Sequence, residues 1–120
     1  MNTEINYIIS AEEIPKYALV CLNEKGLWIQ ADASTLVRMP ALGLTLNAPR
    51  IGFSGNVIML GIVNNNEWNW TPKGLLYVDV IPGGITQTLP AALGDKAQIV
   101  GYAVNETLIY FNPQYIIIEV

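Results

Sequence analysis

Ile99-Val100-Gly101-Tyr102-Ala103-Val104 is an apolar run with a glycine inside it. The same arrangement recurs in Ala41-Leu42-Gly43-Leu44-Thr45-Leu46 and in Met59-Leu60-Gly61-Ile62-Val63. Short apolar runs predict strands, and a glycine weakens a strand unless it serves a bulge, a sharp bend or a close approach of two backbones. Three such strands therefore predict a small sheet that curves strongly, as in a compact β-barrel or β-sandwich.

A hairpin is expected before these strands. Residues 17–22 and 27–31 are apolar and are separated by Asn23-Glu24-Lys25-Gly26, a turn with glycine where a positive φ is needed. Residues 32–35 are expected to form a loop, because Pro40 leaves room for at most one helical turn.

The remaining strands are expected at 75–81, 108–111 and 115–120, with turns at Pro82-Gly83-Gly84 and Asn112-Pro113. About eight short strands, at intervals of about 8–12 residues and without an amphipathic helix between them, predict an antiparallel all-β fold. The length of 120 residues suits one domain. We expect residues 1–16 to be an N-terminal arm or edge strand and residues 17–120 to be a single β domain.

The content of charged residues is low. They make up 13% of the chain, against about 25% in an ordinary soluble domain. A folded monomer of this mass exposes about 6,400 Å², so sixteen charged side chains, six basic and ten acidic, would be widely spaced. Obligate homo-oligomers exclude charge from their interfaces, and we therefore expect self-association. A neutral surface rich in Asn and Thr is the alternative.

Several partners and compartments are disfavoured by the sequence. The formal net charge is −4 and no two basic residues are adjacent, which argues against a nucleic-acid partner. The apolar runs are too short to cross a membrane, and the start Met1-Asn2-Thr3-Glu4 is unlike a signal peptide, so we expect synthesis in the cytoplasm without export. Cys21 lies in an apolar strand and is expected to be a buried hydrophobic residue.

Catalysis is not expected. The chain has no histidine, which removes the commonest general base and the commonest metal ligand. The adjacent acids Glu12 and Glu13 lie in the N-terminal segment, and Cys21 has no histidine partner, so neither a glycosidase pair nor a nucleophilic thiol is indicated. We expect no catalytic residue, no cofactor and no metal.

Trp68 and Trp70 are the clearest candidates for a functional surface. They are two positions apart in an Asn-rich stretch, so in extended backbone they project from the same face. Such a pair could stack on sugar rings while the Asn side chains form hydrogen bonds. Alternatively, both indoles pack into the core or a subunit interface, where tryptophan is common. We favour the second interpretation.

The order of motifs resembles a module of tailed-bacteriophage virion proteins, found in capsid decoration proteins, head fibres and the ends of tail fibres. The matching segments are Trp68-Asn69-Trp70-Thr71-Pro72-Lys73-Gly74, Tyr77-Val78, Gly83-Gly84-Ile85-Thr86-Gln87-Thr88, Val100-Gly101-Tyr102-Ala103 and Ile109-Tyr110-Phe111-Asn112-Pro113. Ala31-Asp32-Ala33 and Met39-Pro40-Ala41-Leu42-Gly43 are similar to the upstream part of the same module.

This resemblance implies a β-rich, often trimeric domain that coats or projects from the virion surface and performs no catalysis. The expected partners are copies of the same chain and phage capsid or tail proteins. The expected function is capsid decoration or stabilisation, and the alternative is a fibre tip that binds a glycan on the host surface. The candidate residues for a subunit interface or ligand platform are Trp68, Trp70, Tyr77, Tyr110, Phe111 and Pro113.

Overall fold

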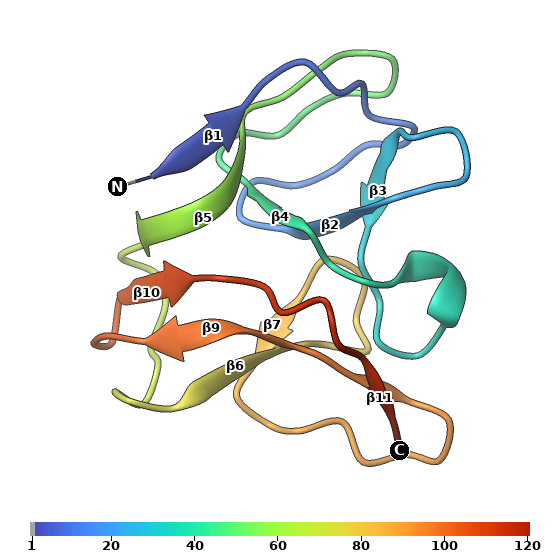
Figure 1. Ribbon diagram of the computed structural model, residues 1–120. Coiled ribbons are helices and arrows are strands. Elements are labelled where there is room, and N and C mark those ends of the chain that lie inside the picture. The colour runs from blue at the N-terminus through green and yellow to red at the C-terminus, as the bar shows by residue number, and fades with distance from the viewer. Residues whose placement is uncertain (1) are drawn as a thin grey trace.

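Nine strands form one antiparallel sheet that curls into a half-barrel (Figure 1). The computed structural model describes residues 2–120. The main path of the sheet runs β3-β2-β4-β5-β10-β9-β6-β7, with β1 beside β5, and a separate two-stranded sheet pairs β11 with β8. The strands are β1 (Thr3–Ile5), β2 (Leu19–Leu22), β3 (Trp28–Gln30), β4 (Gly43–Thr45), β5 (Val57–Asn64), β6 (Leu75–Val78), β7 (Ile85–Thr86), β8 (Lys96–Ala97), β9 (Ile99–Ala103), β10 (Leu108–Phe111) and β11 (Ile118–Glu119).

The prediction of an antiparallel all-β fold is confirmed. Residues 2–120 contain no α-helix, and their one helical element is the short 3-10 turn η1 (Leu36–Arg38). None of their helices could therefore span a membrane. The predicted number of about eight strands matches the main path of the sheet, whereas the described residues form eleven strands in all.

The predicted hairpin is present as β2 and β3. Cys21 faces Ile29 in the antiparallel register, and the N–H of Asn23 donates to the carbonyl of Leu27 at 2.9 Å. Gly26 has a φ of 75°, in the left-handed region that glycine adopts most easily. The side-chain Oδ1 of Asn23 accepts hydrogen bonds from the N–H groups of Lys25 and Leu27 and so fixes the turn.

Strand β5 joins the two halves of the curled sheet (Figure 1). Its first half pairs with β4 and β1, while its second half, from Gly61 onward, pairs with β10. Gly61 has a φ of 143°, and a Cβ there would collide with Asn2. The glycine expected at a bend therefore lies where one half of the sheet passes into the other.

Gly101 lies at a β-bulge in β9. The register with β6 shifts between Leu76 and Tyr77, which face Gly101 and Ile99, so that Val100 is the extra residue. Gly101 has a φ of 150°, and a Cβ at this position would clash with the carbonyl oxygen of Tyr110 on β10. The predicted association of strand glycines with bulges and close approach is thus confirmed at this site.

The turn before β7 is hydrogen-bonded to the first hairpin, at the other end of the curled sheet. The N–H of Leu19 donates to the carbonyl of Gly83 at 2.9 Å, and the N–H of Gly83 donates to the carbonyl of Ala31 at 2.8 Å. Gly83 has a φ of 77°, and a Cβ there would press on Gln30 and Ala18. Backbone hydrogen bonds therefore link residues about fifty to sixty positions apart.

The N-terminal segment is packed onto the sheet. β1 pairs with β5, and Ile14 is buried in a small hydrophobic cluster with Val20, Trp28 and Val57. Arg38 of η1 forms an ion pair with Glu12 at 3.1 Å. Burial alone would raise the pKa of Glu12, but hydrogen bonds from Arg38 and from the N–H of Gln30 outweigh it and lower the pKa below its usual value.

The shortest strands differ from the sequence-based expectation. Of the strand expected at 115–120, only Ile118–Glu119 pairs, and it does so with β8. The strand expected at 75–81 ends at Val78. The two-residue strands β7 and β8 were not predicted, because so short a pairing is set by its partner strand and carries no periodic pattern of its own.

Three side-chain amides each form a pair of hydrogen bonds with the N–H and the carbonyl of one residue. Asn2 exchanges two hydrogen bonds with the N–H and carbonyl of Ile62, and Gln87 does the same with Thr71. Gln98, which is 1% exposed, accepts from the N–H of Ala41 at 2.7 Å and donates to its carbonyl at 2.9 Å. It also donates to the carbonyl of Gln114. A primary amide has the donor and acceptor of a peptide unit, so each of these side chains extends the backbone pairing.

Gln98→Ala is expected to lower the free energy of unfolding by about 3–5 kcal/mol, because it leaves the buried N–H and carbonyl of Ala41 without partners. Gln87→Ala is the matched control, since it removes the same pair of hydrogen bonds at an exposed position, where water replaces them. Its expected cost is below about 1 kcal/mol. Urea denaturation measures both values, and equal costs would contradict the assigned role of Gln98.

Candidate functional site

Trp68 and Trp70 belong to a cluster of three aromatic rings. The ring centroids of Trp68 and Trp70 are 5.7 Å apart, and those of Trp68 and Tyr17 are 5.4 Å apart, both pairs being tilted. The backbone N–H of Trp68 donates to the carbonyl of Asn65, and the backbone N–H of Trp70 donates to the carbonyl of Glu106. These bonds hold the loop between β5 and β6 so that both indoles lie on one side, as their spacing predicts.

The packing of the cluster limits what the indoles can do. Tyr17, Trp68 and Trp70 are partly buried and lie against the main hydrophobic core. The indole N–H of Trp70 is shielded from solvent and has no hydrogen-bond partner among residues 2–120. That N–H group is closed to a ligand in solution, and the Trp70 ring packs against the main core.

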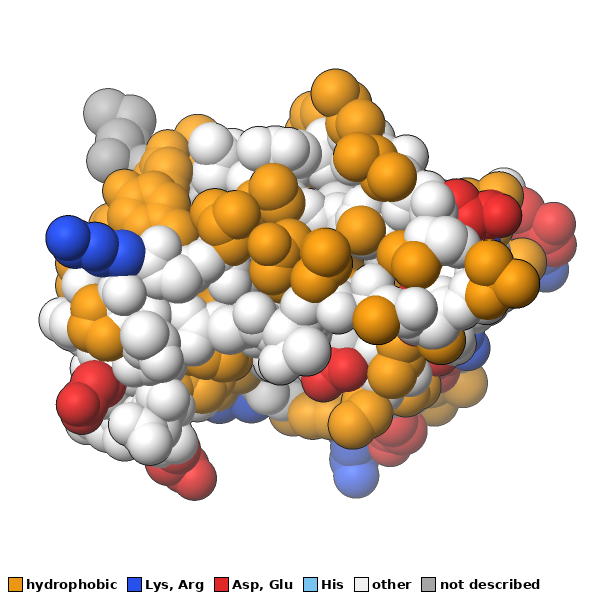
Figure 2. All heavy atoms as spheres, turned by 90° about the horizontal axis from the view of Figure 1, so that it is seen from below, with side chains coloured by type: hydrophobic (Ala, Val, Ile, Leu, Met, Phe, Trp, Pro, Cys, Tyr) orange, Lys and Arg blue, Asp and Glu red, His pale blue; other side chains and the backbone are white. Residues whose placement is uncertain are grey.

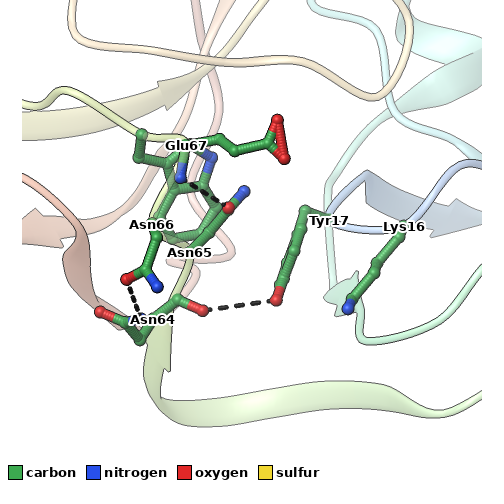
Figure 3. Close-up of a pocket in the computed structure, with 7 residues that line it drawn as sticks. Lys16, Tyr17, Asn64, Asn65, Asn66 and Glu67 are labelled. Carbon is green, nitrogen blue, oxygen red and sulfur yellow. Dashed lines mark hydrogen bonds between the residues drawn. The ribbon is translucent and has the colours of Figure 1, made fainter.

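A shallow pocket of about 680 Å³ lies beside Trp68 (Figure 3). Lys16 and Tyr17 form one wall, and the run Asn64-Asn65-Asn66-Glu67-Trp68 forms the other. The Tyr17 hydroxyl reaches across toward the carbonyl of Asn64 at 3.4 Å, and the Lys16 ammonium lies 4.8 Å from the Tyr17 ring centroid. The pocket therefore combines aromatic rings with side-chain amides, the groups that recognise sugar hydroxyls and ring faces.

Local hydrogen bonds fix the Asn-rich wall. Asn64 donates from Nδ2 to Oδ1 of Asn66 at 3.0 Å, and Oδ1 of Asn65 accepts from the N–H of Glu67 at 3.0 Å. Thr107 donates to Oδ1 of Asn64 at 2.9 Å and ties the wall to the turn before β10. The pocket is therefore held in shape by the fold.

Two further candidates, Tyr77 and Tyr110, lie apart from the tryptophans, on the side of the sheet that points away from the core. Tyr110 of β10 stands opposite Tyr102 of β9, and their ring centroids are 5.5 Å apart. Tyr77 of β6 faces Ile99 and Thr86 of the neighbouring strands. Both tyrosines are half-buried and point away from the core.

Phe111 and Pro113 lie inside the protomer. Phe111 is fully buried in the main core, and Pro113 is buried directly after β10. Adjacent residues of a strand point to opposite faces, so Tyr110 and Phe111 cannot belong to one surface. The six candidates therefore do not form one site. Trp68 and Trp70 belong to the aromatic cluster, Tyr77 and Tyr110 point outward from the sheet, and Phe111 and Pro113 are buried.

Cys21 and the acidic side chains were the remaining candidates for chemistry. Cys21 is buried, and desolvation raises the pKa of its thiol to about 11, so the thiol stays protonated at neutral pH. Residues 2–120 contain no group of three or more His, Cys, Asp or Glu side chains that could hold a metal ion. The ion pair of Glu12 and Arg38 ties the N-terminal segment to η1.

Tyr17 and Tyr102 were not predicted as site residues. Tyr17 comes from the loop before β2 and meets Trp68 only through the fold, so no local pattern indicates the contact. Its backbone φ of 60° is uncommon for a residue with a side chain. Tyr102 could have been found from alternation, because its neighbours Gly101 and Ala103 are small and buried while it points outward.

Trp70→Ala is expected to lower the free energy of unfolding by about 3 kcal/mol, through lost burial against the core and a residual cavity. Trp68→Ala should have a similar effect, because its ring packs between Tyr17 and Trp70. Asn69→Ala is the control, since Asn69 lies exposed between the two indoles and should cost less than about 0.5 kcal/mol. Thermal and urea melts unchanged by both tryptophan replacements would refute the packing role.

Comparison with known proteins leaves the family of this chain open. No protein-family model matches the sequence, and no curated protein matches it significantly.

Proposed function

We propose that this chain is a non-catalytic structural subunit of a bacteriophage particle that decorates or stabilises the capsid as a homotrimer. The observation that carries the proposal is an apolar surface with few charges. Leu93 is 96% exposed, Val37 78% and Tyr115 74%. The accessible surface of 6549 Å² is shared by only sixteen charged residues. Surfaces of this kind are typical of subunits that bury them against other subunits.

The fold is consistent with such a role. Backbone hydrogen bonds link distant segments of the sheet, and the buried amide of Gln98 connects its own segment to the loop at Ala41. A rigid scaffold of this kind suits a coat subunit, which must present the same surface in every copy. The resemblance of the motif order to phage virion proteins supports a location on a virion surface, with capsid or tail proteins as further partners.

Light scattering coupled to size exclusion tests the oligomer. The expected mass is about 40 kDa, three times the 13.2 kDa of one chain. A monomer at micromolar concentration would contradict the proposal. The gene order provides a second measurement, because a decoration protein is expected beside a major capsid protein and a fibre protein beside tail genes.

The pocket beside Trp68 supports a second candidate, a fibre tip that binds a glycan on the host surface. Tyr17 and Trp68 offer ring faces, and Asn64, Asn65 and Asn66 offer amide donors and acceptors within one hollow. This pocket differs from the platform of Trp68 and Trp70 expected from the sequence, since Tyr17 takes the place of Trp70. The two charged residues of the lining, Lys16 and Glu67, are of opposite sign, so neutral saccharides suit this pocket of aromatic rings and amides.

For this candidate, Asn66→Ala should abolish binding on a glycan array while leaving the thermal melt unchanged, because Asn66 is exposed and lines the pocket. Asn69→Ala is the matched control, as it removes an exposed amide from the same loop outside the pocket. Binding equal in both variants and the wild type, or no binding by the wild type, would reject the glycan-binding role.

A further inference from the structure

One row of large apolar side chains crosses four strands on the outside of the sheet. The register places Ile62 of β5 opposite Tyr110 of β10, Tyr110 opposite Tyr102 of β9, and Tyr102 opposite Leu75 of β6. Their neighbours Val63, Ile109, Ala103 and Leu76 are buried in the core or packed against it. The four side chains of the row therefore point away from the core, and we call this surface the outer face.

The composition of the outer face is unusual. Ile62 is 42% exposed, and Leu75 and Tyr102 are each 44% exposed. No charged residue occurs in β5, β6, β9 or β10. The solvent side of an antiparallel sheet normally carries polar residues in alternation with the buried ones. In the row of four, apolar and aromatic side chains stand in these places instead, as expected of a surface that is covered in the working protein.

The outer face also has a shape that another protein surface can fit. A hollow of about 120 Å³ is lined by apolar, aromatic and amide residues, namely Leu75, Ile99, Gly101, Tyr102, Tyr110, Asn112 and Gln114. Figure 2 views the molecule from below Figure 1, on the side of β6, where hydrophobic and other uncharged side chains cover much of the middle and most charged side chains lie toward the margins.

We propose that the outer face of β5, β10, β9 and β6 is the surface through which copies of this chain pack together, with Tyr102 and Tyr110 near its centre. This inference rests on the proposed homotrimer and identifies its interface. Aromatic residues in a partly hollowed, uncharged patch have the character of interface hot spots.

Charge favours a second copy as the occupant. The chain has a net charge of −4, so two copies repel one another over most of their surfaces. The outer face has no charge on its strands, so identical chains can meet there without like-charge contacts between these strands. It also offers no charged group to attract an acidic or basic partner.

The test introduces one positive charge at matched positions. Tyr102→Lys places it on the outer face, Leu75→Lys repeats it on the adjacent strand, and Phe53→Lys places it on the loop between β4 and β5 outside the outer face, where Phe53 is 67% exposed. Light scattering over a dilution series measures assembly, and thermal melts monitor folding. Leu75→Lys provides the result if Tyr102→Lys does not fold.

Tyr102→Lys and Leu75→Lys are expected to raise the dissociation constant about 30-fold or more, because a charge is buried without a partner. Phe53→Lys should assemble like the wild type, and Tyr102→Phe, which keeps the ring, should also assemble. Assembly of both outer-face variants at wild-type strength would overturn this inference alone and leave the proposed trimer intact. Equal weakening by Phe53→Lys would also overturn it, whereas a monomeric wild type would refute the trimer itself.

Discussion

The close approach of β9 and β10 at Gly101 is the constraint on which the rest of the structure depends. A side chain at this position would collide with the carbonyl oxygen of Tyr110, so the two backbones come together only because residue 101 has no Cβ. The bulge at this point lets β9 bend and changes which residues face inward, with Val100 buried and Tyr102 exposed. One steric condition thus shapes both the core and the outer face.

Gly61 and Gly83 mark two further places in the half-barrel where a side chain would not fit. Gly61 lies where β5 changes partners, and Gly83 inserts its peptide between the ends of β2 and β3. Each has a positive φ and a neighbour where a Cβ would lie. A sheet of short strands cannot curl this tightly through twist alone, so the bends are concentrated at residues without a side chain.

Much of the fold could be predicted from local patterns, whereas the site could be predicted only in part. The turn of the first hairpin and the bounds of β10 follow from nearby residues, because turn chemistry and apolar runs are local signals. Tyr17 and Trp68 meet across about fifty residues, and this contact has no local signal. The motif that contains Tyr110 and Phe111 suggests that both residues belong to one site. Strand alternation shows instead that Tyr110 points outward while its neighbour Phe111 is buried.

The side-chain amides of Asn2, Gln87 and Gln98 take the place that ion pairs occupy in many proteins. Ion pairs are few among residues 2–120, namely Arg38 with Glu12 and Lys96 with Glu119. An amide does not titrate between acid and alkaline conditions, and dissolved salt does not screen it as it screens separated charges. The connections that these three amides make are therefore largely indifferent to ionic strength and acidity, unlike the link that the ion pair of Glu12 and Arg38 makes.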